Sequence, residues 1–195
     1  MRPTYSRTGR PPRRPRRLQL PCLLLTALSA HAALGDECRD AALAANPAAE
    51  TLCSDAIARL SYQGAATDPE ATGAGRQALA AAFNNRAMVR IASGNLAGAG
   101  EDLGEALSLA PDRWAIYLNR GNLHLAEHQP QAALSDYARA QQLAPAAGEA
   151  VTRNSVLAYR ALGDLGRASA SLMEAESLSQ RAAVDTAGAP GRSPR

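Results

Sequence analysis

The sequence contains no lysine, and all 21 of its basic residues are arginine, which indicates a GC-rich coding bias more than a functional choice. It also lacks a phosphate-binding loop, a nucleophile elbow and a recognisable pair of catalytic carboxylates. The motifs of these common enzyme classes are therefore missing. We expect a protein that is not an enzyme and that uses no cofactor.

The apolar run near the N-terminus is too short to span a membrane. Residues 1–32 contain seven arginines and no acidic residue, and the apolar run begins at Leu18 and extends to Leu28. It is followed by small residues that end at Ala32, at the positions that a signal peptidase recognises. The pattern predicts a signal peptide over 1–32, cleaved after Ala32, and a periplasmic or secreted protein. An uncleaved N-terminal anchor is the main alternative.

Cleavage of this leader reverses the net charge. The whole chain has 21 basic and 18 acidic residues, and removing the seven leader arginines leaves 14 basic residues and a net charge of about −4. The basic pI of 9.0 is thus a property of the leader. We expect no nucleic-acid partner and no stable membrane insertion after cleavage.

A 34-residue period runs through the second half of the chain. Segments 80–113 and 114–147 align without a gap, and 149–182 follows after one extra residue. Small and large residues coincide in all three segments, at Ala99, Ala133 and Ala168, at Leu103, Tyr137 and Leu172, and at Ala106, Ala140 and Ala175. Such self-similarity indicates a repeat array.

Each repeat has the pattern of a helix hairpin. Two stretches of about 13 residues carry helical apolar spacing, and the breaks between them fall at Gly94, Gln129 and Gly163. A single hairpin cannot bury its apolar face alone, so the hairpins must stack on one another. The sequence therefore predicts an all-α fold.

The repeat resembles the tetratricopeptide repeat family. The matching residues are Phe83, Ala87, Gly94, Ala99, Leu103, Ala106 and Pro111 in the first unit, Tyr117, Gly121, Ala133, Tyr137, Ala140 and Pro145 in the second, and Gly163, Ala168, Leu172 and Ala175 in the third. The second unit departs from the pattern at His128, where glycine is usual. The resemblance implies a short superhelical array of antiparallel hairpins, a TPR-like α-solenoid.

The predicted organisation follows from the repeat boundaries. It comprises a signal peptide over 1–32, a degenerate capping hairpin over 33–61, a loop over 62–79, repeats over 80–113, 114–147 and 148–182, and a disordered tail over 183–195.

Two cysteines remain after removal of the leader. Cys38 and Cys53 are fifteen positions apart, and Asn46-Pro47 breaks the helical pattern between them. In an oxidising compartment we expect a disulfide, which stabilises by about 3 kcal/mol in the chain-entropy model. The alternative is a pair of small buried thiols.

The family resemblance also implies a ligand face, because first helices of successive hairpins line a concave groove that binds a peptide or protein segment. One asparagine per unit, at Asn85, Asn119 and Asn154, occupies a groove position and can bond to a peptide backbone. The other predicted groove residues are Asn84, Met88, Asn122, Leu125, Arg153, Leu157 and Arg160. The alternative for the asparagines is a hydrogen bond to the neighbouring helix or to water.

Two further pairs of residues have specific explanations. Arg86 and Arg120 recur in step with Asp102 and Asp136, sixteen residues later, so we expect an ion pair within each hairpin. His124 lies four residues before His128, a spacing that can place two imidazoles on one metal, but no zinc-protease pattern accompanies them. We expect no metal site.

These patterns favour an exported protein-interaction scaffold that binds a peptide or protein segment in the groove of its repeats. A self-assembling structural or accessory protein without a peptide ligand is the alternative.

Overall fold

The computed structural model describes residues 36–44, 46–62 and 73–187, with side chains up to residue 181. The predicted signal peptide lies outside these residues. The described residues are helical and contain no strand. A helical segment over 36–43 is followed by α2 (Ala49–Tyr62), α3 (Gly73–Ser93), α4 (Leu96–Leu109), α5 (Trp114–Ala126), α6 (Pro130–Leu143), the 3-10 turn η1 (Pro145–Ala147), α7 (Gly148–Ala161) and α8 (Leu165–Ala187).

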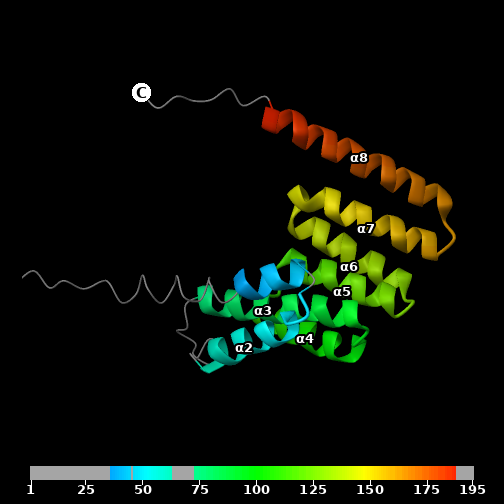
Figure 1. Cartoon of the computed structure of the whole chain (residues 1–195). Coiled ribbons are helices and arrows are strands. Elements are labelled where there is room, and N and C mark those ends of the chain that lie inside the picture. Colours follow the sequence, from blue (N-terminus) through cyan, green and yellow to red (C-terminus); the bar gives the residue numbers. More distant parts are fainter. Residues whose placement is uncertain (1–35, 45, 63–72, 188–195) are drawn as a thin grey trace, which may run out of the picture.

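Helices that are adjacent in the chain pack against each other (Figure 1). Helices α3 and α4 form unit 1, α5 and α6 form unit 2, and α7 and α8 form unit 3. The first helices of these units also contact one another, α3 against α5 and α5 against α7. The prediction of an all-α fold is therefore confirmed for the described residues.

The turn inside each unit passes through a left-handed backbone conformation at the same repeat position. Gly94 has φ 82° and Gly163 has φ 75°, whereas unit 2 uses His128 with φ 59°. Glycine adopts this conformation without a steric penalty, and a side chain is strained there. His128 is thus the one turn residue of the three that the backbone disfavours.

The core alternates small and large residues along the second helices. Leu103 and Tyr137, the large residues of units 1 and 2, are 0% and 1% exposed, and the alanines that flank them are also buried. Gly121 has no side chain where the ring of Tyr137 lies, and a Cβ at Gly121 would collide with that ring. The small position on the first helix is therefore matched to the large position on the second.

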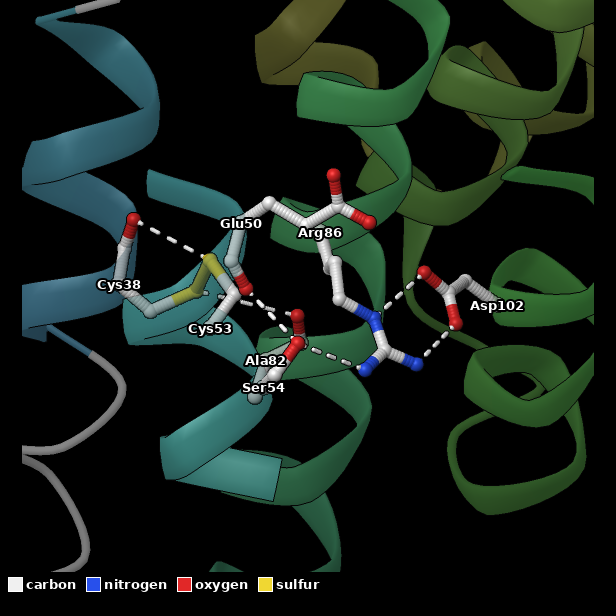
Figure 2. Close-up of a disulfide and its surroundings, with 7 residues drawn as sticks. All are labelled: Cys38, Glu50, Cys53, Ser54, Ala82, Arg86 and Asp102. Carbon is white, nitrogen blue, oxygen red and sulfur yellow. Dashed lines mark hydrogen bonds and ion pairs between the residues drawn. A yellow bond between two sulfur atoms is a disulfide. The ribbon is translucent and has the colours of Figure 1, made fainter. Parts of the chain in front are cut away.

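A disulfide joins Cys38 and Cys53, as predicted, with their Cα atoms 4.7 Å apart (Figure 2). Both cysteines are fully buried, in a cluster with Leu60 of α2 and Leu79 of α3. The two helices over 36–62, which we call the cap, are thereby fastened to each other and packed on unit 1.

Two predicted boundaries differ from the structure. Tyr62 belongs to α2, and α3 begins at Gly73, so 73–79 is helical and was wrongly included in the predicted loop. Residues 63–72 lie outside the described residues. Burial of Leu79 against the cap favours helix in a stretch whose glycines suggest a loop.

The last helix is also longer than predicted. Helix α8 continues to Ala187, five residues into the predicted disordered tail, because this stretch contains no glycine or proline before Gly188. The rest of the predicted tail, 188–195, lies outside the described residues.

Candidate functional site

The first helices α3, α5 and α7 lie side by side and carry all of the predicted groove residues. The exposure of these residues differs along the array. Asn84, Asn85 and Asn119 are buried and Asn122 and Asn154 are half-buried, whereas Arg153, Leu157 and Arg160 on α7 are exposed. Among the predicted groove residues, the most accessible therefore lie on unit 3.

The asparagines bond to one another across neighbouring first helices. The Nδ2 of Asn119 donates to the Oδ1 of Asn84 over 2.9 Å, and the Nδ2 of Asn154 donates to the Oδ1 of Asn122 over 3.1 Å. The Tyr137 hydroxyl also donates to the Oδ1 of Asn122, over 2.8 Å. The sequence left two interpretations of these asparagines open, a bond to a peptide ligand or a bond to the neighbouring helix or water. In the structure, Asn119 and Asn154 each bond to the neighbouring helix.

Burial of the Tyr137 ring has a further effect on this cluster. Desolvation, with a smaller effect of the Asp136 charge, raises the pKa of Tyr137 above its ordinary value. The hydroxyl therefore stays protonated and remains a donor to Asn122. The network fixes the orientation of α5 relative to α6 and α7.

Helix α7 presents a basic and apolar surface. Arg153, Leu157 and Arg160 follow one another at spacings of four and three residues, so they share one helix face. All three are exposed, Leu157 by 55%. Arg153 pairs with Glu149 over 2.7 Å, an exposed bond within the same helix that a competing anion can replace at little cost.

Partly buried apolar side chains occupy the corresponding repeat positions on the other first helices. They are Met88 and Ile91 on α3, and Leu118 and Leu125 on α5. An apolar strip with two arginines at its C-terminal end can bind a segment that combines apolar side chains with an acidic group.

The predicted ion pairs of units 1 and 2 are confirmed. Arg86 donates to both carboxylate oxygens of Asp102, over 2.7 and 2.9 Å, and Arg120 donates to both oxygens of Asp136, over 2.7 and 2.8 Å. The hydrogen bond to the aspartate raises the pKa of each arginine, although desolvation opposes it. Bidentate pairing of this kind fixes the two helices of a hairpin in register.

Sequence reasoning missed the extension of the first pair into the cap. Arg90 lies 3.1 Å from Asp102 and 2.9 Å from Glu50 of α2, while Arg86 donates to the Ser54 hydroxyl over 3.1 Å. Figure 2 shows the Arg86 guanidinium between Ser54 and Asp102. The network therefore joins three helices. The sequence gives no signal for the pair of Glu50 and Arg90, because the two residues are far apart in the chain and meet only in the folded protein.

Aromatic rings support the same arginines. The Arg86 guanidinium lies 5.6 Å from the centre of the Phe83 ring, and that of Arg120 lies 5.3 Å from the Tyr117 ring. Cation–π contacts of this kind are favourable where the cation is partly desolvated. Each arginine is thus held by an aspartate and by an aromatic ring, so its role is structural.

The two histidines face different surroundings. The Nε2 of His124 lies 3.5 Å from Asp136 and its Nδ1 lies 3.1 Å from the side-chain oxygen of Gln129, while His128 occupies the strained turn. Within the ranges that the structure covers, no group of three or more histidines, cysteines and acidic residues has a metal-binding arrangement. The histidines are accounted for by hydrogen bonding and turn geometry.

A shallow depression of about 400 Å³ lies where unit 2 meets unit 3. Trp114 and Glu149 line it, together with four alanines between Ala144 and Ala150. Its walls are mostly apolar. The depression could not be predicted from the sequence, because small residues on either side of a 3-10 turn form no recognisable motif.

None of the helices in the described ranges is both long and apolar enough to cross a lipid bilayer. No protein-family model matches the sequence, and no curated protein matches it.

Proposed function

We propose that this chain is an exported interaction scaffold of the tetratricopeptide-repeat type, which binds a protein segment on the face formed by α3, α5 and α7. The 34-residue period and the contacts between successive first helices support this proposal. The leader pattern and the buried disulfide between Cys38 and Cys53 are compatible with an oxidising compartment outside the cytoplasm.

The observation that carries the proposal is the exposed row of Arg153, Leu157 and Arg160 on α7, at repeat positions that hold partly buried apolar side chains on α5 and α3. A half-exposed leucine between two arginines suits a ligand with an apolar side chain beside an acidic one. The bound segment is therefore proposed to be apolar with acidic flanks.

The asparagines take a supporting role in this proposal. Because Asn119 and Asn154 already donate to neighbouring helices, they hold the first helices in register. Leu157 and the two arginines then make the contacts that distinguish one ligand from another.

Peptide selection followed by calorimetry tests the binding face. Peptides selected from a random library on the immobilised protein should combine apolar and acidic residues. Affinity for a selected peptide should fall at least tenfold in the double variant Arg153→Gln/Arg160→Gln and decline with added salt. Arg59→Gln, an exposed arginine on α2, is the matched control. Equal affinity of the double variant and the wild type would contradict the proposed face.

Export is tested separately by N-terminal sequencing of the protein recovered outside the cytoplasm. The proposal expects a mature N-terminus at Ala33. Recovery of the intact leader would instead favour the N-terminal anchor.

A further inference from the structure

The second helix of unit 3 exposes apolar side chains at positions that are buried or half-buried in units 1 and 2. Leu172 is 43% exposed, whereas its equivalents Leu103 and Tyr137 are 0% and 1% exposed. Leu165 is 68% exposed, although its equivalent in unit 1, Leu96, packs against the core. The position of Leu172 holds a large residue in all three units, so its exposure in unit 3 reflects a missing covering helix and not a change of residue type.

The covering helix in the first two units is the first helix of the next unit. Leu103 of α4 shares a buried cluster with Ile116 and Leu123 of α5. Tyr137 of α6 likewise shares a cluster with Val151 and other residues of α7. Within the part of the chain that the structure describes, α8 contacts only α7 (Figure 1). The stacking surface therefore continues to α8 and is open there.

We propose that a second copy of this chain covers the open face, and that the two copies form a symmetric dimer in which their α8 helices cross. Leu165, Ser169 and Leu172 are spaced by four and three residues, so they form one stripe along α8. When two such helices cross antiparallel near Ser169, Leu165 of each copy lies beside Leu172 of the other. The stripe is thus complementary to itself, as a two-fold contact requires.

The middle of the stripe is suited to burial. Ser169 is small, which permits close approach of the two backbones, and its hydroxyl already donates to the Leu165 carbonyl over 2.9 Å. Covering it therefore leaves no unpaired donor. Arg167 is the one charged residue between Leu165 and Leu172, and it lies on the opposite side of the helix, two residues from both Leu165 and Ser169.

Charge at the ends of the crossing is also complementary. The exposed Glu176 follows the stripe by one helical turn, on the C-terminal side. The antiparallel crossing directs it toward the turn between α7 and α8 of the other copy, where Arg160 is exposed and where Asp164 is already paired with Arg167 over 3.0 Å. Glu176 of one copy is directed away from Glu176 of the other, so like charges stay apart. These features favour a second copy over an unrelated partner.

Analytical ultracentrifugation of the purified protein tests the proposal. A two-helix contact falls in the small interface class below about 1,200 Å², so a concentration series from about 2 to about 300 µM should show a monomer–dimer equilibrium. Leu165→Glu and Leu172→Glu should each shift dissociation to at least tenfold higher concentration. Leu43→Glu is the matched control, because Leu43 is 69% exposed at the opposite end of the molecule. It should dimerise like the wild type.

A crosslink locates the contact. Ser169→Cys should oxidise to a covalent dimer, whereas Gln180→Cys, about three turns further along α8, should not. A monomer throughout the concentration series, dimers unaffected by Leu165→Glu, or equal crosslinking at both positions would overturn the proposal. Since Leu165 and Ser169 lie outside the proposed peptide face, peptide affinity measured at monomeric concentration in the same variants reports on that face separately.

Discussion

Units 1 and 2 hold buried charge and cover their large apolar residues, and unit 3 does neither. The repeat positions that hold the aromatic, the arginine and the aspartate in units 1 and 2 carry Thr152, Ser155 and Ser171 in unit 3. Its ion pairs, such as the one between Arg153 and Glu149, are local and exposed. The difference follows from position: a unit stacked on both sides can shield an ion pair from water, and an end unit cannot.

The comparison also separates the two ends of the molecule. At the N-terminal end, the cap covers unit 1, closed by its disulfide and tied to α3 through Glu50 and Ser54. At the other end of the described residues, α8 has no such cover. We therefore expect the cap and the first two units to contribute most to the free energy of unfolding. We expect unit 3 to carry the surfaces that bind other molecules.

The largest expected effect is at Asp102. Its side chain is 3% exposed and faces Arg86 and Arg90, so Asp102→Ala removes the carboxylate partner of Arg86 and leaves Arg90 with Glu50 alone. Unfolding in urea should show a loss of about 3 to 5 kcal/mol. Glu149→Gln removes an exposed pair in unit 3 and should change stability by less than about 1 kcal/mol. Similar losses in the two variants would erase the distinction between the units.

Removing the disulfide should come next. The double variant Cys38→Ala/Cys53→Ala should lose about 3 kcal/mol, because the unfolded chain regains the entropy of an open loop. Unfolding followed by circular dichroism measures the loss, with the oxidised and reduced wild type as references. If reduction leaves the midpoint unchanged, the cap contributes less to stability than the comparison requires.

A smaller effect on stability is expected in unit 2, where Gly121 packs against the ring of Tyr137. Gly121→Ala places a methyl group against the Tyr137 ring and should cost about 1 to 3 kcal/mol. Gly104→Ala, in the middle of α4 with open space around it, should instead stabilise by about 0.5 to 1 kcal/mol. A thermal melt of each variant distinguishes the two, and the same sign for both would contradict the packing described for unit 2.

The smallest effect concerns the turn of unit 2. His128→Gly removes the strain of a left-handed histidine and should raise the free energy of unfolding by up to about 1 kcal/mol. The reciprocal change Gly163→Ala, in the equivalent turn of unit 3, should lower it by about the same amount. A destabilised His128→Gly variant would show that His128 makes a contact worth more than its strain.

Much of the helical architecture could be predicted because it depends on spacing. The period placed the hairpins, and the sixteen-residue offset between Arg86 and Asp102 predicted their pairing, since both depend on which helix faces meet. The disulfide was predicted from the expected export to an oxidising compartment, together with the break at Asn46-Pro47 that lets the two cysteines meet. Patterns of this kind can be recognised in a single sequence, because they depend only on the spacing of residues along the chain.

Other features depend on neighbours that are distant in the chain. The start of α3 at Gly73 reflects burial of Leu79 against the cap, which outweighs the weak helix propensity of the preceding glycines. Asn119 occupies the predicted position, yet its partner Asn84 is known only once α3 and α5 are side by side. The open stripe on α8 could not be recognised either, because Leu172 fits the repeat as well as Leu103 does.

Amide hydrogen exchange resolved along α4 and α8 tests the contrast between covered and open units most directly. In dilute solution, the amides of 99–106 in α4 should exchange only through near-global unfolding, and those of 168–175 in α8 should exchange much faster through local opening. Raising the protein concentration should slow exchange in α8 alone, as a second copy covers it. Equal protection of the two helices in dilute solution would contradict the account.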